Sequence, residues 1–493
     1  MIQVRPTLSE VLAHEAGAHT HVALTAEVIV DGFTPVALFA ALAGDRPGAF
    51  LLESVEGGEL LGRYSFMGFD VERRVVPEPG DTFGAIHRRL AERRVWSSVP
   101  LPRFAGGVVG FVGFDAISEL EPVPLSERPG VSIPSAGLLL TDEVLVYDHA
   151  GHRLSVIVHA ALDGDRAAAY AAARARIEAI IARIGSASSA LSAWTEAEID
   201  VDALPVRANV SKADFEGAVE RAKQAIVAGE VFQVVLSQRL TVDVSVEPFE
   251  LYRTLRTTNP SPYMFYLAFD DFALVGASPE VLVRREDERL FLRPIAGTRP
   301  RGRTQLEDLQ LEAELLADEK ERAEHRMLLD LGRNDLGRIA RPGTVRVDDP
   351  LHVERYAHVM HIVSDVHAES RERLDGASVL AACFPAGTVS GAPKLRACEL
   401  IAELEPDRRG PYAGAVGYFD YAGHTDTCIA IRTMLVQPGQ VHLQAGAGIV
   451  HDSQPEREYE ECLHKARSGL VAIARTLART LARAQAEPEG GAR

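Results

Sequence analysis

The stretch FYLAFDDFALVGASPEVLVRREDERLFLRP, residues 265–294, indicates the fold class of this chain. It holds four short apolar runs, FYLAF, FALVGAS, VLVRR and LFLRP, separated by acidic or proline-containing turns. Runs of this length and composition are typical of strands, and connections this short join antiparallel neighbours. The helical patterns elsewhere do not alternate with strands at a regular βαβ spacing. We therefore predict an α+β fold with mostly antiparallel sheets.

Outward from this stretch, two helices mark a boundary in the chain. Residues 165–184 carry apolar positions at helical spacing and abundant alanine and arginine, which favours a helix. A second helix begins after Ser211, whose side chain is suited to an N-cap. The intervening residues 185–205 are small and polar and are interpreted as a linker. The predicted units are a first domain over 1–190, a second over 206–467, and a helical, frayed tail over 468–493.

The composition restricts the classes of partner. Hydrophobic residues make up 46% and charged residues 25% of the 493 positions, so a large folded core is expected. The net charge of -18 repels nucleic acid and anionic lipid, and we expect neither nucleic acid nor membrane as a partner. An anionic substrate would need a local cationic pocket or a metal ion.

The N-terminus and the cysteines indicate the cellular compartment. The segment MIQVRPTLSEVLAHE has no apolar signal core, and no apolar run approaches the roughly 20 residues of a membrane span. The four cysteines form no CxxC pair, so they are interpreted as buried free thiols. Both observations predict a cytoplasmic protein. The cysteines are Cys383, Cys398, Cys428 and Cys462.

Two helical segments carry carboxylates at spacings that suit a metal site. Glu321, Glu324 and His325 fall at i, i+3 and i+4, and Glu458, Glu461 and Lys465 fall at i, i+3 and i+7, so each set shares one helix face. If the two faces met, their oxygens would suit Mg²⁺, with water and substrate as the remaining ligands. Taken alone, this spacing is more often that of a solvated charged face, and spacing alone does not overturn that interpretation.

Glycine-rich segments and one arginine are further candidates for a binding site. PIAGTRPRG (294–302) and QAGAGIVHDS (444–453) each place small residues where backbone N–H groups could approach a carboxylate, although a tight turn needs the same residues. FPAGTVSGAPK (384–394) lacks the spacing of a phosphate loop, which argues against nucleotide binding. Arg432 lies among apolar strand residues, and a buried arginine needs an anionic partner.

Together these segments resemble component I of anthranilate synthase, a group of chorismate-utilising enzymes. The similarity runs from about Val206 to Arg467 through VFQVVLSQR, PSPYMFY, GASPE, PIAGTRPRG, AEHRMLLDLGRND, YAHVMHIVS, FPAGTVSGAPK, RGPYAGAVGYFDY, AIRT and QAGAGIVHDS. It is looser in the N-terminal part, through LLES, GRYSFMG and GGVVGFVGFD. The resemblance implies a large, mostly antiparallel β-sandwich surrounded by helices, with two interlocked subdomains.

The resemblance also implies roles for individual positions. Glu324 and Glu461 match magnesium ligands, with Glu321 and Glu458 beside them. Glu280 matches the general acid that protonates the departing C4 hydroxyl of chorismate, a role that needs a raised pKa. His361, associated with the later loss of pyruvate, and Thr388 match active-site positions. The positions that match the chorismate site are Gly297, Thr298, Tyr412, Arg432, Gly446, Ala447, Gly448 and Lys465.

Two positions distinguish between related chemistries. Isochorismate and salicylate synthases carry a lysine, which activates water, where this chain has Gln233. Aminodeoxychorismate synthase carries a nucleophilic lysine where this chain has Ala296. Both differences favour ammonia as the nucleophile and anthranilate as the product, the first committed step toward tryptophan. An aminodeoxyisochorismate synthase, or another chorismate-family synthase, remains the alternative.

The resemblance implies a partner and an inhibitor as well. The sequence has no nucleophilic cysteine of the PxxGxCLGxQ type, so we expect a separate glutamine amidotransferase subunit, anthranilate synthase component II, to supply ammonia. Ser54, Pro262, Tyr263 and Met264 match the tryptophan site of the family. Feedback inhibition by tryptophan is therefore expected.

Overall fold

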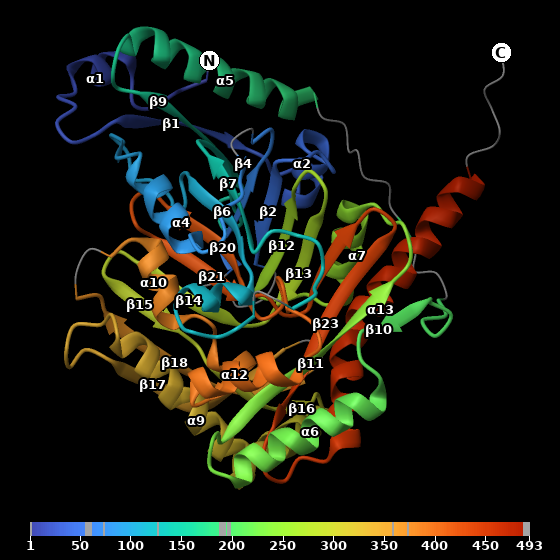
Figure 1. Ribbon diagram of the computed structural model, residues 1–493. Helices are drawn as coiled ribbons and strands as arrows, with labels where there is room; N and C mark the ends of the chain where they lie inside the picture. Colours follow the sequence, from blue (N-terminus) through green and yellow to red (C-terminus); the bar gives the residue numbers. More distant parts are fainter. Residues whose placement is uncertain are drawn as a thin grey trace.

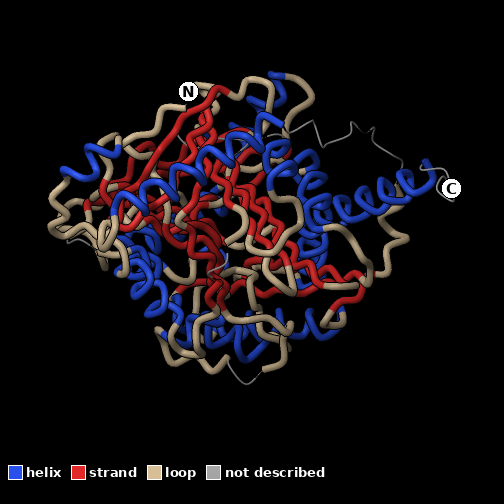
Figure 2. The backbone as a smooth tube through the Cα atoms, turned by 90° about the horizontal axis from the view of Figure 1, so that it is seen from above, coloured by secondary structure: helices blue, strands red, loops and turns tan. Residues whose placement is uncertain are grey.

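Two large β-sheets form the centre of the molecule, and helices surround them (Figure 1). Figure 2 shows the same arrangement from above, with the strands gathered in the middle and most helices outside. The computed structural model describes residues 2–54, 62–71, 74–125, 128–186, 194, 199–356, 359–371 and 374–486.

The first sheet has 13 strands and the second has ten. In spatial order the first comprises β10 (Val206–Ala208), β11 (Gln233–Val242), β23 (Gln440–Ile449), β22 (Thr433–Gln437), β13 (Ala273–Ser278), β12 (Tyr263–Ala268), β2 (Ala49–Glu53), β3 (Tyr64–Gly68), β8 (Glu143–Asp148), β9 (Arg153–Ala161), β1 (His21–Ile29) and β5 (Val95–Trp96), with β19 (Gly391–Ala392) also paired to β11. The second comprises β16 (Ile295–Pro300), β18 (Val359–Glu369), β15 (Arg289–Leu292), β14 (Val281–Glu286), β21 (Thr425–Ile429), β20 (Ala415–Asp420), β6 (Gly107–Val112), β7 (Ala136–Thr141) and β4 (Arg74–Val75), with β17 (Arg346–Arg355) also paired to β18.

The helices lie mainly on the outer faces of the two sheets. They are α1 (Leu8–Ala13), α2 (Pro35–Leu42), α4 (Thr82–Ala91), the 3₁₀ helix η1 (Phe114–Glu119), α5 (Arg166–Ser186), α6 (Lys212–Val227), α7 (Pro248–Thr258), α8 (Gln305–Ala317), α9 (Glu319–Gly337), α10 (Gly376–Cys383), α11 (Gly387–Ser390), α12 (Lys394–Leu404) and α13 (Pro455–Ala486). Among the described residues, no helix has the length and apolar character needed to cross a bilayer.

Three clusters of buried side chains join these layers. One lies between the sheets and includes Phe50 and Leu267 from the first and Val109 and Phe111 from the second. Another packs α2, α5, α7 and α13 against the first sheet, and a third packs α4, α6, α10 and α12. Each fully buried leucine or phenylalanine contributes about 1.5–3 kcal/mol to the free energy of folding. All four cysteines are free and buried, as predicted.

The local predictions agree with the structure at both helices. The first is α5, and the second is α6, whose N-cap Ser211 accepts a hydrogen bond from the main-chain N–H of Asp214 at 3.1 Å. The helical tail predicted over 468–493 is not a separate helix. It is part of the longer helix α13, which begins at Pro455 and includes the segment with Glu458 and Glu461. Its distal part contacts α7, where Arg479 donates to Thr254 Oγ1 at 2.9 Å.

The predicted α+β fold with mostly antiparallel sheets is confirmed. Every strand pair in the described part of the chain is antiparallel except β1 with β5. Strand β2 pairs with β12 and β6 pairs with β20, so N-terminal and C-terminal strands share both sheets. Much of the predicted linker lies outside the described residues. The division at residues 190–206 stays a prediction.

The stretch at 265–294 carries the chain from one sheet to the other. Its first two runs form the β12–β13 hairpin of the first sheet, and its last two form the β14–β15 hairpin of the second. Pro279 and Glu280 lie at this crossing. The chain crosses again, in the opposite direction, between β21 and β22, where Arg432 has a φ of 51°.

Main-chain hydrogen bonds hold the two crossings side by side. The N–H of Ile429 donates to the carbonyl of Glu280 at 3.0 Å, and the N–H of Ala277 donates to the carbonyl of Arg432 at 3.1 Å. Glu280 and Arg432 therefore lie where the backbone passes from one sheet to the other, rather than on a loop that projects from the fold.

Candidate active site

Glu280 is a buried carboxyl group at the first crossing, with 7% of its surface exposed. Burial raises the pKa of Glu280 to about 8, because the charged form loses its hydration. The Thr388 hydroxyl, the Ile295 main-chain N–H and the Lys465 charge act in the opposite direction. The group is therefore mostly protonated at neutral pH and can donate a proton.

Arg432, at the second crossing, is linked to Lys465 on α13. Its Nη1 donates to the Lys465 carbonyl at 3.1 Å, while Lys465 Nζ donates to the Gly446 carbonyl at 3.0 Å and pairs with Glu461 at 2.7 Å. Burial lowers the pKa of Arg432. Two cations thus lie together in a chain of net charge -18, one of them paired with Glu461.

Two glycines of β23 allow neighbouring side chains to approach the backbone. A Cβ atom at Gly446 would lie 2.7 Å from Tyr412 Oη, and one at Gly448 would lie 2.5 Å from Gln233 Nε2. Any side chain at either position would displace these groups. Ala447, between them, is buried and lies opposite Leu236 of β11.

His361 lies on β18 directly opposite Thr298 of β16. Its Nδ1 is 2.9 Å from the Gly297 carbonyl and 3.1 Å from Thr298 Oγ1. A carbonyl oxygen only accepts, so Nδ1 carries the proton and the lone pair of the neutral ring is on Nε2. Burial is the main cause that lowers the pKa of His361, which favours this neutral form.

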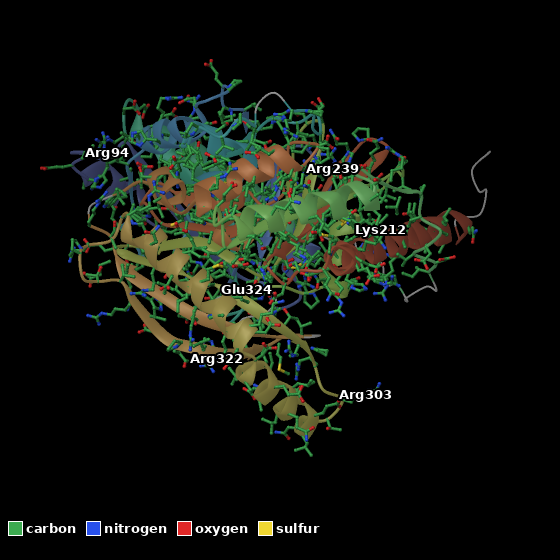
Figure 3. The ribbon with its side chains drawn as sticks, turned by 60° about the horizontal axis from the view of Figure 1, so that its bottom comes forward. Arg94, Lys212, Arg239, Arg303, Arg322 and Glu324 are labelled. Atoms are coloured by element: carbon green, nitrogen blue, oxygen red, sulfur yellow. The ribbon has the colours of Figure 1, made fainter. Side chains whose placement is uncertain are left out.

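The carboxylates of α9 face Gln233. Glu324 Oε1 accepts from Gln233 Nε2 at 3.1 Å, and burial, reinforced by Glu321, raises the pKa of Glu324. Glu321 is itself paired with Arg299 at 3.1 Å. Figure 3 labels Glu324 nearer the middle of the view than Arg303, which lies just before α8 at the projecting end of this region.

Two lysines act both on a carboxylate of α13 and on a carboxylate of α9. Burial and the neighbouring Glu461 raise the pKa of Glu458, whereas the Lys465 charge lowers the pKa of both Glu458 and Glu324. Lys320 acts on the same two groups. The α9 and α13 faces therefore lie within electrostatic range of one another.

The donor set suits a hard cation. Within the described ranges, no three His, Cys, Asp or Glu side chains form a ready-made metal cluster. Four carboxylates are nevertheless present, two of them ion-paired, Glu321 with Arg299 and Glu461 with Lys465. Glu324 and Glu458 are each half-buried near another carboxylate. A divalent cation with oxygen ligands would offset that repulsion and the cost of burial.

A separate pocket contains all four residues that match the tryptophan site. Ser54, Pro262, Tyr263 and Met264 line it together with Glu53, Tyr64, Phe66, Arg103, Val416, Tyr418, Asp426 and Cys428. Two lining residues each have a buried atom that finds no hydrogen-bond partner among the described residues, Glu53 Oε1 and Arg103 Nε. One carboxylate oxygen and one guanidinium N–H of the lining residues thus lack a described partner, in a wall that also holds Ser54, Asp426 and several aromatic side chains.

Comparison with known proteins identifies the family of the chain. The family described as chorismate binding enzyme matches residues 48–471. The chain belongs to the chorismate binding enzyme family. Anthranilate synthase component 1 from Acetivibrio thermocellus is 45% identical over 95% of this chain and 98% of the relative, and that from Aquifex aeolicus is 44% identical over 91% and 94%. The resemblance to anthranilate synthase component I is confirmed.

Solved structures of the chorismate binding enzyme family support the fold. Anthranilate synthase component I from Streptococcus pneumoniae is 34% identical, with a TM-score of 0.75 over 90% of this chain and 99% of that chain. A menaquinone-specific isochorismate synthase from Escherichia coli is 22% identical, with a TM-score of 0.70 over 95% of this chain and 98% of that chain. The second likeness concerns the fold alone.

Several of the residues predicted to bind chorismate and metal in this family member lie close to one another, apart from the separate pocket of the predicted tryptophan residues. Direct contacts join Gln233 to Glu324, and Lys465 to Glu461, Gly446 and Arg432. His361, which is hydrogen-bonded to the Gly297 carbonyl, lies near the α9 carboxylates, because a Cβ atom at Gly297 would lie 3.2 Å from Glu321 Oε2. The individual roles stay predictions.

Sequence reasoning missed a buried ion pair beneath the site. Arg409, 2% exposed, pairs with Glu405 at 2.6 Å and donates to the carbonyl of Val389, next to Thr388. Its guanidinium lies 5.4 Å from the Tyr412 ring centroid. The available signal was the i, i+4 spacing of Glu405 and Arg409, but a surface pair has the same spacing.

Proposed function

We propose that this chain is the synthase subunit that converts chorismate and ammonia into anthranilate and pyruvate, the first committed step of tryptophan biosynthesis. The observation that carries the proposal is Glu280, a buried carboxyl group with a pKa of about 8 beside the Arg432 crossing. Such a group holds a proton at neutral pH and can release it to a leaving hydroxyl.

In the first step, ammonia adds to C2 of the ring while the C4 hydroxyl leaves as water with the proton of Glu280. The side chain of Gln233 is neutral and cannot activate water as a base, which favours ammonia as the nucleophile. In the second step, a base removes the C2 proton and the enolpyruvyl group leaves as pyruvate. His361 is suited to that role, because the lone pair of its neutral ring is on Nε2. The ring becomes aromatic.

The carboxylates support magnesium as the cofactor. Glu324 and Glu461 would hold Mg²⁺, with Glu321 and Glu458 beside them. Bound there, Mg²⁺ supplies charge neutralisation and a template for the substrate carboxylate. Arg432 and Lys465 bind the anionic groups of the substrate, and Gly446 and Gly448 let Tyr412 and Gln233 line the site closely.

Ammonia would come from a separate glutamine amidotransferase subunit. The name component 1, which the similar proteins carry, supports a second component. We also propose that the protein is cytoplasmic, as predicted from the sequence.

One assay tests the proposed function. The purified chain is incubated with chorismate, Mg²⁺ and ammonium, and anthranilate is followed by its fluorescence. Anthranilate without the partner subunit is the expected result. A non-aromatic aminated product would instead support an aminodeoxyisochorismate synthase, and turnover to isochorismate or no turnover would contradict ammonia addition.

The second pocket supports tryptophan as a feedback inhibitor. Arg103 and Glu53 offer one cationic and one anionic partner for an amino-acid zwitterion, because an atom of each is buried without a described partner. Phe66, Tyr418 and Met264 offer apolar contacts for the indole ring. Ser54, Pro262 and Tyr263 complete the wall.

Replacing Arg103 by lysine is expected to weaken inhibition by tryptophan. The variant keeps a cation but loses the Nε–H, so the inhibition constant should rise roughly 10-fold or more, while kcat without tryptophan is unchanged. The matched control is Arg93→Lys, since Arg93 is also a half-buried, ion-paired arginine near an aromatic ring but lies outside the pocket. Equal inhibition of both variants and the unsubstituted protein would contradict the assignment.

A further inference from the structure

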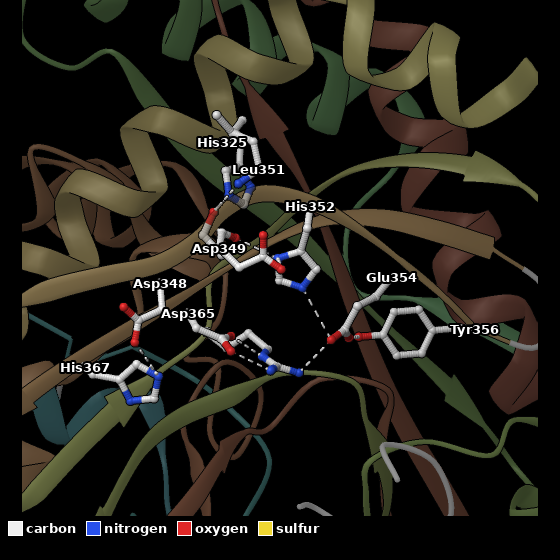
Figure 4. Close-up of polar contacts among 11 residues, drawn as sticks. His325, Asp348, Asp349, Leu351, His352, Glu354, Tyr356, Asp365 and His367 are labelled. Carbon is white, nitrogen blue, oxygen red and sulfur yellow. Dashed lines mark hydrogen bonds and ion pairs between the residues drawn. The ribbon is translucent and has the colours of Figure 1, made fainter. Parts of the chain in front are cut away.

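An aromatic and charged side-chain network lies beside His361. The ring of Tyr356 packs edge-on against the His361 ring, with centroids 5.5 Å apart and an interplanar angle of 61°. The Tyr356 hydroxyl donates to Glu354 Oε2 at 2.9 Å. Figure 4 shows Glu354 and Tyr356 joined by this bond, with His352 also within reach of Glu354.

Glu354 is itself fixed by Arg293. Its Oε1 accepts from Arg293 Nη1 at 2.9 Å, and the same guanidinium is bound at both ends by Asp365, at 2.6 and 2.9 Å. An arginine held by two carboxylates has little freedom to rotate. The network therefore runs from Asp365 through Arg293 and Glu354 to Tyr356, and the Tyr356 ring contacts His361.

Strand pairing places this network on the face that carries His361. β18 lies between β16 and β17, and His361 is the Cα partner of Thr298 on one side and Glu354 on the other. Directly opposite residues of antiparallel strands share a face. His361 is thus bounded by Thr298 and Gly297 at Nδ1 and by Tyr356 at the ring edge.

We propose that Tyr356 is a positioning residue for the reaction, which orients the His361 imidazole through its ring while its hydroxyl is anchored by Glu354 and Arg293. The inference rests on the proposed function, in which His361 Nε2 removes a ring proton. The hydrogen bonds at Nδ1 fix which nitrogen carries the lone pair, and the Tyr356 ring fixes where that lone pair points. A small error in the direction of a general base is costly to rate.

Packing alone does not account for the Tyr356 hydroxyl. A phenylalanine ring would fill the same space, so the hydroxyl and its bond to Glu354 add orientation rather than volume. Burial and Glu354 are the main causes that raise the pKa of Tyr356, and the charge of Glu280 contributes to the same shift.

The first test is Tyr356→Phe, with Glu354→Gln as a second variant in case the first does not fold. Tyr356→Phe should lower kcat roughly 10-fold with little change in KM for chorismate, because substrate binding is retained and the proton-transfer step is slowed. The aminated, non-aromatic intermediate should accumulate. Glu354→Gln retains an acceptor for the tyrosine hydroxyl but loses the ion pair, so an intermediate effect is expected.

A double-variant cycle separates positioning from a general structural role. Tyr356→Phe should have no further effect on kcat in a His361→Ala background, because the group that it orients is already absent. Asp348→Asn is the matched control: Asp348 pairs with His367 on the same two strands, as Figure 4 shows, but away from His361. It should leave kcat unchanged. A further 10-fold loss in the His361→Ala background, or unchanged kcat in Tyr356→Phe, would overturn the inference.

A measurement without substrate distinguishes this inference from the proposed function. Histidine ring ¹⁵N resonances report the tautomer and mobility of each imidazole, and the signal absent from His361→Ala identifies His361. The full-length protein should show a single Nδ1–H form for His361, and Tyr356→Phe should broaden or shift that signal. An unperturbed signal refutes the positioning role, whereas a missing anthranilate product refutes only the proposed function.

Discussion

Replacing Glu280 by glutamine is expected to lower kcat by roughly 10²- to 10⁴-fold, the usual contribution of a positioned general acid. Glutamine has nearly the same size, so the main-chain bond between the Glu280 carbonyl and Ile429 remains. What is lost is the proton for the departing C4 hydroxyl. Steady-state measurement of anthranilate formation, with chorismate and ammonium saturating, gives the change directly.

The pH profile provides an independent measure of the same group. Burial raises the pKa of Glu280 to about 8, so the carboxyl group is protonated below that value and loses its proton as the pH rises through it. Activity that needs the protonated form should therefore fall on the alkaline side with a midpoint about 8, and Glu280→Gln should lack this limb.

Asp420→Asn is the matched control for the acid. Asp420 is another buried carboxyl group, whose pKa burial raises to about 7, and it accepts main-chain hydrogen bonds from Ala105 and Ala422 outside the site. Its replacement should alter the free energy of unfolding without removing the alkaline limb. If Glu280→Gln keeps full activity while Asp420→Asn loses it, the acid has been assigned to the wrong residue.

Glu461→Gln is expected to abolish turnover to the limit of detection while the chain stays folded. Glu461 is half-exposed at 48% of its side-chain surface, so its replacement removes little packing. Its carboxylate is a proposed ligand, and a catalytic metal ion stabilises the transition state by several kcal/mol, which corresponds to at least ~100-fold in rate. Calorimetric titration with Mg²⁺ should show weakened binding in parallel with the lost activity.

The neighbouring Glu460 offers a control on the same helix, because it is exposed and was not predicted to bind metal. Glu460→Gln should titrate and turn over like the unsubstituted protein. A chelator should abolish activity, and added Mg²⁺ should restore it. Normal activity in Glu461→Gln would refute the ligand assignment, and full activity in excess chelator would refute the metal requirement.

Local sequence patterns were sufficient to predict much of the secondary structure. The amphipathic pattern at 165–184 and the serine cap at Ser211 predicted α5 and α6, because helix limits depend on neighbouring residues. The four runs at 265–294 likewise became β12 to β15. The transfer of the chain between sheets at Pro279 could not be predicted, since it depends on pairing with strands far away in the sequence, such as β2 and β21.

The candidate site, too, could be predicted from the sequence only where the pattern is local. Helical spacing placed Glu321 and Glu324 on one face, but only the fold brings Lys465 of α13 near Glu324 of α9. Arg293 and Tyr356 were not singled out, because their partner Glu354 lies 61 residues from one and two from the other. Neither spacing is distinctive in the sequence, and the network exists only because β16, β17 and β18 are neighbours.

Both sheets are built from N-terminal and C-terminal strands, and this has a consequence for folding. A polypeptide starting after residue 205 would lack β2 and β6, and the edges of β12 and β20 that pair with them would be open. Open strand edges are templates for aggregation. The residues that bear the proposed chemistry therefore lie in a part of the chain that leaves two strand edges open, and β2 and β6 of the N-terminal part cover those edges.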